Sequence, residues 1–130
     1  MLTLMITGFE VDPQNVTTIL GIEPTFTARK GEQGKSGYPR KFNGWWLDVK
    51  TEPLRDGETH AHALAAMVDC LRGRDAAFKR LREELKPKPI TIYGGFYIKG
   101  DAQSGLWLDP AEMEVLAACG IGWGVDLFAE

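Results

Sequence analysis

The chain has 130 residues, of which 44% are hydrophobic and 25% are charged, a composition typical of one globular domain with its own core. This composition excludes a disordered or fibrous chain, and the first apolar stretch, MLTLMI, is far shorter than the roughly 18 residues of a membrane span. Because that stretch also lacks the basic and cleavage segments of an export signal, we expect a single domain over residues 1–130, located in the cytoplasm.

The net charge of −3 is unevenly distributed along the chain. Residues 29–41 hold five of the fifteen basic residues but only one of the eighteen acidic ones. A local basic segment on an acidic chain argues against general nucleic-acid binding, while it permits one anionic partner at this segment.

The first predicted elements are a strand and a short helix. In residues 2–9, LTLMITGF, apolar and β-branched residues alternate loosely before a glycine, which indicates a strand. In the following VDPQNVTTILGI, Asp12 is placed to cap a helix, Pro13 to occupy its first position and Gly21 to end it.

Two further strands are predicted on either side of a glycine-rich loop. Residues 25–30, TFTARK, are followed by GEQGKSGYPRKFNG, and a loop this long in a compact domain is either mobile or functional. WWLDVKT then predicts a strand in which Trp45 faces the core, so that Trp46 and Asp48 stand on the opposite face.

The second half of the chain is predicted to be mainly helical, with one clear strand. Residues 58–85 show apolar residues at helical spacing on both sides of Gly73, which indicates two helices or one kinked helix. PITIYGGFYIK is the clearest strand of the chain, and residues 106–108 could add a short one. The ending predicts a helix from Asp109 to Gly120 and a last strand over 121–128.

These elements predict an α+β fold, a largely antiparallel sheet of five or six strands with helices packed on one face. VDPQNVTTILGI and LDPAEMEVLAACGI share Asp-Pro, apolar residues three, six and seven positions after the proline, and a closing Gly-Ile. The similarity indicates either two pseudo-repeated halves or only the start and stop signals that many helices share.

GEQGKS, residues 31–36, resembles the end of a nucleotide-binding phosphate loop. That pattern needs a glycine or alanine five positions before Gly34, where the chain has Arg29. It also needs a helix to begin at Lys35, whereas the following SGYPRKFNGWW contains a proline and two glycines. We therefore interpret the segment as a basic loop and expect no nucleotide cofactor.

Metal-dependent and hydrolytic chemistry have little support in the sequence. His60 and His62 would point about 200° apart on a helix, and no Cys-x-x-Cys or Cys/His pair occurs at ligand spacing, so no metal is expected. The chain has two cysteines, Cys70 and Cys119, and no recognisable export signal, so both thiols are expected to be reduced and buried. A carboxylate pair drawn from Asp48, Glu52, Asp56, Glu58 and Asp126 is the remaining catalytic alternative, although no spacing selects one.

A resemblance to a known family rests on LGIEPTFTARKGE, the GWWLDVKT and ITIYGGFYI strands, and the closing Asp-Pro helix with GVDLF. Over nearly its whole length the chain resembles a bacterial family known as domain of unknown function four-two-seven-nine. The family's strand tryptophan matches Trp45, and Trp46 departs from the small or polar residue that follows it there. The resemblance implies a small α+β domain and no established activity, substrate or catalytic residue.

The sequence therefore predicts an uncharacterised, non-catalytic binding or protein-interaction domain, for example one that neutralises a toxin. The partner would be a protein or an anionic ligand at the basic loop, and a second copy of the chain is another candidate. The alternative is a small-molecule-binding domain or an enzyme with acidic residues in a cleft. The candidate binding residues are Arg29, Lys30, Glu32, Lys35, Tyr38, Arg40, Trp46 and Asp48. For Arg29 to Glu32 a structural turn is the competing interpretation, and for Trp46 it is burial beneath a helix.

Overall fold

The structure is a computed structural model that describes residues 2–49, 61–98 and 107–129. The elements in chain order are β1 (Leu2–Phe9), α1 (Gln14–Leu20), β2 (Phe26–Ala28), β3 (Asn43–Val49), α2 (Ala61–Leu71), α3 (Asp75–Leu85), β4 (Ile90–Ile98), α4 (Pro110–Cys119) and β5 (Gly122–Ala129). Of the predicted short strand at 106–108, Leu106 is outside the described residues, and Trp107 and Leu108 are in no strand.

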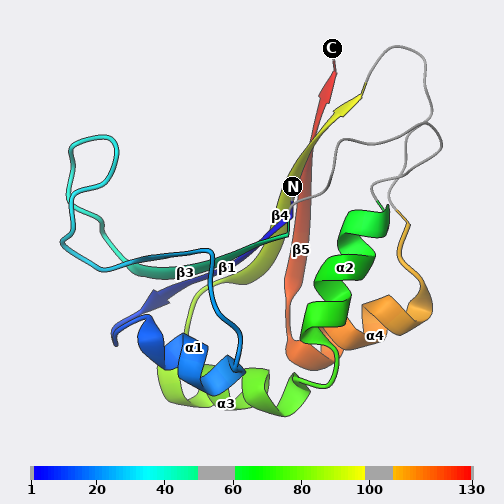
Figure 1. The fold of residues 1–130 in the computed structure, drawn as a ribbon, viewed down its shortest axis with the longest axis horizontal. Helices are drawn as coiled ribbons and strands as arrows, with labels where there is room; N and C mark the ends of the chain where they lie inside the picture. The colour runs from blue at the N-terminus through cyan, green and yellow to red at the C-terminus, as the bar shows by residue number, and fades with distance from the viewer. Residues whose placement is uncertain (1, 50–60, 99–106, 130) are drawn as a thin grey trace.

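The described strands form one sheet in the order β2-β3-β1-β4-β5. Every neighbouring pair is antiparallel except β4 and β5, which run parallel. The four described helices all lie on one side of this sheet (Figure 1). The predicted α+β fold with helices on one face is thereby confirmed.

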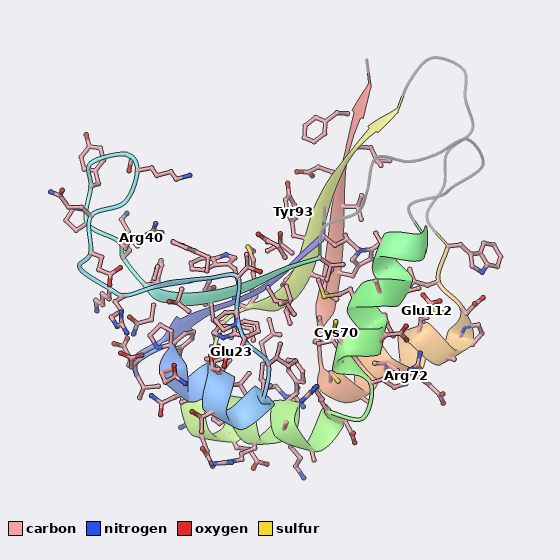
Figure 2. All side chains as sticks on the ribbon, viewed as in Figure 1. Glu23, Arg40, Cys70, Arg72, Tyr93 and Glu112 are labelled. Carbon is pink, nitrogen blue, oxygen red and sulfur yellow. The ribbon has the colours of Figure 1, made fainter. Side chains whose placement is uncertain are left out.

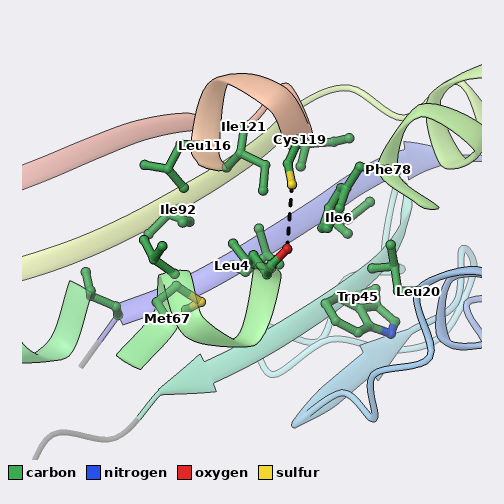
Figure 3. Packing of buried hydrophobic residues seen from close by; sticks show 14 of the residues in the cluster. Leu4, Ile6, Leu20, Trp45, Met67, Phe78, Ile92, Leu116, Cys119 and Ile121 are labelled. Carbon is green, nitrogen blue, oxygen red and sulfur yellow. Dashed lines mark hydrogen bonds between the residues drawn. The ribbon is translucent and has the colours of Figure 1, made fainter. Parts of the chain in front are cut away.

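The core lies between the helices and alternate residues of the strands. Leu2, Leu4 and Ile6 of β1 are fully buried, because successive side chains of a strand point to opposite faces and these three face the helices. Trp45 and Ile92 continue the same layer on β3 and β4. The helices contribute a matching apolar layer (Figure 3), formed by Val16, Leu20, Leu64, Met67, Val68, Leu71, Phe78, Leu81 and Leu116.

The predicted helix ends are largely as the sequence indicates. The Oδ1 atom of Asp12 accepts the backbone N–H of Gln14 at 2.8 Å, at the start of α1. Gly21 and Gly120 follow α1 and α4 with φ of 67° and 66°, the left-handed conformation that ends a helix. Gly73, with φ of 78°, separates α2 from α3, so residues 58–85 contain two helices rather than one kinked helix.

The predicted pseudo-repeat is not confirmed. Although α1 and α4 share their start and stop signals, their surroundings in the sheet differ. The strand after α1 pairs antiparallel with β3, whereas the strand after α4 pairs parallel with β4. Common helix start and stop signals are sufficient to explain the sequence similarity.

The two cysteines have different environments, and neither is in a disulfide bond. Cys119 is buried, and its Sγ lies 3.8 Å from the carbonyl oxygen of Leu71 (Figure 3). Burial raises the pKa of the Cys119 thiol. Cys70 is exposed on α2, so the prediction of two buried thiols is wrong for this residue.

Candidate functional site

The sheet face turned away from the helices carries the candidate site. Residues that stand opposite each other in neighbouring strands point to the same side, so the pairs Met5 with Trp46, Phe26 with Trp46, and Thr3 with both Asp48 and Tyr93 place these side chains together on that face. Figure 2 shows Arg40 and Tyr93 on this same side of the sheet. We call this surface the uncovered face, because no described helix packs on it.

The basic loop borders the uncovered face at one end and is held by backbone hydrogen bonds (Figure 1). The N–H of Gly31 donates to the carbonyl of Arg40 at 2.9 Å, and the N–H of Arg40 donates to the carbonyl of Glu32 at 2.7 Å. Gln33 and Pro39 form an isolated β-bridge. The loop is thus a narrow hydrogen-bonded hairpin that extends beyond β2 and β3.

A buried amide fixes the loop to the sheet. Asn43 donates from Nδ2 to the carbonyls of Phe9 and Val11 at 2.9 and 3.1 Å, and its Oδ1 accepts the N–H of Lys30 at 2.7 Å. Because a buried amide left without partners would destabilise the fold, these bonds define where both ends of the loop leave the sheet. Arg40 and Lys41 are thereby positioned over the uncovered face.

Trp46 lies flat against the sheet because Gly44 leaves space for its ring. A Cβ atom at Gly44 would lie only 2.1 Å from the indole of Trp46, well inside any allowed contact. The indole packs against Phe26, with ring centroids 5.2 Å apart, and the guanidinium of Arg40 lies 5.2 Å from the Phe26 centroid. This stack of two aromatic rings and a guanidinium gives a partly apolar, positively charged surface.

A pocket of about 250 Å³ opens beside this stack. Its lining residues come from β1, β3 and the end of the basic loop, and they are Thr7, Arg40, Lys41, Phe42, Asn43 and Trp46. Two cationic side chains, two aromatic side chains and two neutral polar side chains therefore meet at one place. A carboxylate or a phosphate is the group that such a lining is suited to bind.

Arg29, Lys30 and Glu32 are placed outside this pocket, in contacts with neighbouring parts of the chain. The Nε of Arg29 donates to Asp12 at 2.8 Å, and its NH1 lies 3.6 Å from Glu32. Hydrogen bonds from Arg29 and from the backbone N–H of Gln14 hold the pKa of the Asp12 carboxyl below its ordinary value. Lys30 Nζ lies 4.0 Å from Glu10.

The other predicted residues are divided between the loop and the far end of the face. Lys35 and Tyr38 lie in the outer turn of the loop, where Tyr38 is 75% exposed. Asp48 accepts the hydroxyl of Thr3 at 2.7 Å. The structure therefore brings Arg40 and Trp46 to one pocket and leaves the remaining six predicted residues outside it.

The end of the uncovered face near β5 is acidic. The hydroxyl of Tyr93 donates to Asp126 of β5, and this hydrogen bond raises the pKa of Tyr93. Asp48 of β3 lies two strands away from Tyr93, with Thr3 of β1 between them.

Of the carboxylates considered for catalysis, Glu52, Asp56 and Glu58 are outside the described residues. His60 is also outside them, while His62 lies in the first turn of α2.

Several pocket residues were not predicted as part of a site. Thr7, Phe42 and Asn43 line the pocket from two different segments, and the pairing of β1 with β3 brings them together. Phe26 joins the adjoining aromatic stack through the pairing of β2 with β3. Lys41 belongs to the basic segment and could have been included on charge alone. Phe26 had a weaker signal, an apolar residue in a strand that precedes a basic loop.

A second pocket, of about 350 Å³, lies on the helix side between the turn that joins α2 to α3 and helix α4. Arg72, Asp75 and Glu114 provide its charged groups, and Cys119 contributes to its base. Arg72 already lies 3.4 Å from Asp69, and both cationic and anionic side chains line the opening. Its lining indicates no particular ligand.

The described part of the chain was also compared with the requirements of a metal site and of a membrane-spanning helix. No group of three or more His, Cys, Asp or Glu side chains there could hold a metal ion. None of the helices over residues 2–49, 61–98 and 107–129 has the length and apolar character needed to cross a membrane.

Comparison with known proteins identifies a family and no characterised relative. No curated protein and no solved structure matches the chain. The family described as a domain of unknown function (DUF4279) matches residues 1–130, which is the family indicated by the strand and helix motifs. The chain therefore belongs to the DUF4279 family.

Proposed function

We propose that this domain is a non-catalytic binding module, located in the cytoplasm, that holds an acidic segment of a partner protein against its uncovered face. The observation that carries the proposal is that Arg40, Lys41 and Trp46 line one pocket on that face. Neutralisation of a toxin is one form that such binding would take.

The size of the pocket favours a side chain over a complete small molecule as its occupant. Pockets that enclose a small-molecule ligand usually measure roughly 300–1,000 Å³. The pocket beside Trp46 is about 250 Å³, so it is below that range. One carboxylate side chain, contacted by the guanidinium of Arg40 and the ammonium of Lys41, is a suitable occupant.

The surroundings of the pocket favour a protein surface as the rest of the partner. Phe42 is 64% exposed and Phe26 is 47% exposed, and both lie next to the pocket or its aromatic stack. Aromatic residues and arginine are enriched at the centres of protein interfaces, where they contribute a large share of the binding energy. A partner that covers these rings would bury apolar area around a central ion pair.

The positions of the carboxylates also favour binding over catalysis in an acidic cleft. Glu32, Asp48 and Asp126 line neither of the two pockets. Asp126 is exposed, and Glu32 is engaged with Arg29 in the loop. Because a catalytic acid or base is usually found in a cleft, the lining of these two pockets favours binding over catalysis by these carboxylates.

The test is to pan a random peptide display library on the immobilised domain and on a variant with Arg40→Glu and Lys41→Glu. We expect the unmodified domain to enrich peptides rich in Asp and Glu, because the pocket offers two cations. The variant should bind a synthetic copy of the best peptide at least tenfold more weakly, a loss of about 1.4 kcal/mol. Binding to the unmodified domain should weaken as salt is raised.

Lys79→Glu with Lys86→Glu is the matched control, since it also changes the net charge by four units but lies on the opposite side of the sheet, in and just after α3. This control should keep the affinity of the unmodified domain. Enriched peptides without an acidic bias, or an equal loss of affinity in the pocket variant and the control, would refute the proposal.

A further inference from the structure

We propose that β5 is a self-association edge, at which the β5 strands of two copies pair antiparallel across a two-fold axis through Val125. This inference is independent of the proposed function, because it concerns the opposite edge of the sheet. It rests on the edge strands, on the side chains of β5, and on the register in which β5 complements itself.

The two edges of the sheet differ in how they are protected. β2 has only three residues and is followed at once by Arg29 and Lys30, and short edges flanked by positive charge resist pairing with another chain. β5 has eight residues, GWGVDLFA, without proline, lysine or arginine. Among the described residues, no strand pairs with β5 on the side away from β4.

The only charged side chain of β5, Asp126, does not protect this edge in the way an edge lysine does. Its carboxylate accepts the hydroxyl of Tyr93 on β4, so it is directed back over its own sheet. An added strand would form its ladder with backbone N–H and C=O groups on the outer side of β5. An identical strand is the partner that the side chains favour.

Centring the antiparallel pair on Val125 places large residues opposite small ones. Phe128 then stands opposite Gly122, Asp126 opposite Gly124, and Trp123 opposite Leu127. Moving the centre by one residue to Asp126 would place two like charges directly opposite each other, which destabilises a strand pair. The register through Val125 avoids this repulsion. Because of the two-fold symmetry, each favourable pairing occurs twice in the dimer.

The exposure of the apolar residues agrees with this register. Leu127 is 63% exposed although it points to the same side of the sheet as Val125, which is partly buried against the core. Figure 1 shows the reason: the helices cover the N-terminal half of β5, and its C-terminal half extends past them. In the two-fold pair, Leu127 lies against Trp123 of the second copy, which is 37% exposed. Each copy thus covers apolar surface that its own helices do not reach.

The test uses sedimentation velocity over a range of protein concentrations, with two substitutions at one position. In the proposed register residue 124 faces Asp126 of the second copy, and a Cβ at Gly124 would come no closer than 4.0 Å to Tyr93, so a side chain fits there. Gly124→Asp should weaken dimerisation at least tenfold by like-charge repulsion. Gly124→Lys should preserve or strengthen it, because the lysine would meet a carboxylate.

A second variant does not depend on position 124. Leu127→Lys should also yield monomers, whereas Met113→Lys, at an exposed apolar residue of α4, should leave dimerisation unchanged. Circular dichroism establishes that each variant is folded. A domain that is monomeric at every concentration, or a dimer that responds equally to Gly124→Asp and Gly124→Lys, or that tolerates Leu127→Lys, would overturn the inference.

Discussion

Gly44 determines the shape of the uncovered face next to Trp46 because it has no side chain. The indole of Trp46 occupies the space in which a Cβ of residue 44 would lie, and in that position it stacks with Phe26. A larger residue would push the indole outward into the place proposed for the partner. The orientation of one aromatic ring is thus set by a glycine two residues before it.

This relationship predicts that the effect of Gly44→Ala on the free energy of unfolding changes sign when Trp46 is replaced by alanine. Gly44→Ala should lower the free energy of unfolding by about 1–3 kcal/mol, the usual cost of overpacking. In a Trp46→Ala background the clash is gone, and the same change should be neutral or stabilising, since glycine in a strand interior costs roughly 0.5–1 kcal/mol relative to alanine. Urea unfolding of the four proteins measures both values.

Gly34→Ala is the control for the loss of a glycine as such, because a Cβ there meets its nearest atom at 3.5 Å, an ordinary contact. It should change stability little. An equal loss on Gly44→Ala in both backgrounds would show that the position of Trp46 does not depend on Gly44.

At the scale of elements, α3 and the turn before it hold the ends of the other helices. Arg74 donates through NH1 to the carbonyl of Leu20 at the end of α1, at 2.6 Å, and through Nε to the carbonyl of Cys70 near the end of α2, at 3.0 Å. Arg82 donates to the carbonyl of Cys119 at the end of α4. Cations are favourable there, because the last carbonyls of a helix have no partner within it and carry partial negative charge.

Arg82→Met should therefore cost about 1–3 kcal/mol of unfolding free energy, the range for losing a hydrogen bond to a charged group. Arg80→Met is the matched control on the same helix, since Arg80 forms only an exposed pair with Glu84 at 2.8 Å. An exposed pair of this kind contributes little to stability. Chemical denaturation of both variants gives the comparison, and equal losses would contradict the proposed role of Arg82.

The local signals of these elements could be predicted from the sequence. Asp12 and Gly21 bracket α1, Asp109 and Gly120 bracket α4, and adjacent tryptophans must face opposite sides of a strand. Each prediction depends on residues within one or two turns of each other, so the chain itself contains the necessary information. Trp45 is accordingly buried and donates to Thr17, while Trp46 is on the uncovered face.

The remaining features depend on contacts between distant segments. Nothing near Arg82 in the sequence indicates that it reaches α4, and nothing near Trp46 indicates whether a helix covers it. The pocket joins Thr7 to residues 40–46, and its existence follows from the β1–β3 register rather than from spacing. Charge clustering identified the loop but could not separate Arg40, which lines the pocket, from Arg29, which pairs with Asp12.

At the scale of the whole molecule, the closed core separates the two thiols. Cys70 is exposed, whereas Cys119 is buried under α2 and α3 with its pKa raised by that burial. Since the thiolate is the reactive form, and since Cys119 is almost fully buried at the base of the helix-side pocket, the two thiols should react at very different rates.

Ellman's reagent should therefore modify one thiol quickly in the native protein and two in urea. Cys70→Ser should remove the fast reaction, and Cys119→Ala should leave it intact. Two fast equivalents in the native protein would mean that α2 and α3 do not bury Cys119 as the structure shows.

The central place of β1 in the sheet affects how the protein is made. β1 pairs with β3 on one side and with β4 on the other, and both partners follow it in the chain, so β1 is synthesised well before it can acquire both neighbours. Until β4 has emerged, its apolar residues Leu2, Leu4 and Ile6 have no complete layer to join. During synthesis there is thus an interval in which the apolar side chains of β1 are exposed before β4 is available to pair with it. Chaperones that bind short apolar segments would recognise β1 during this interval.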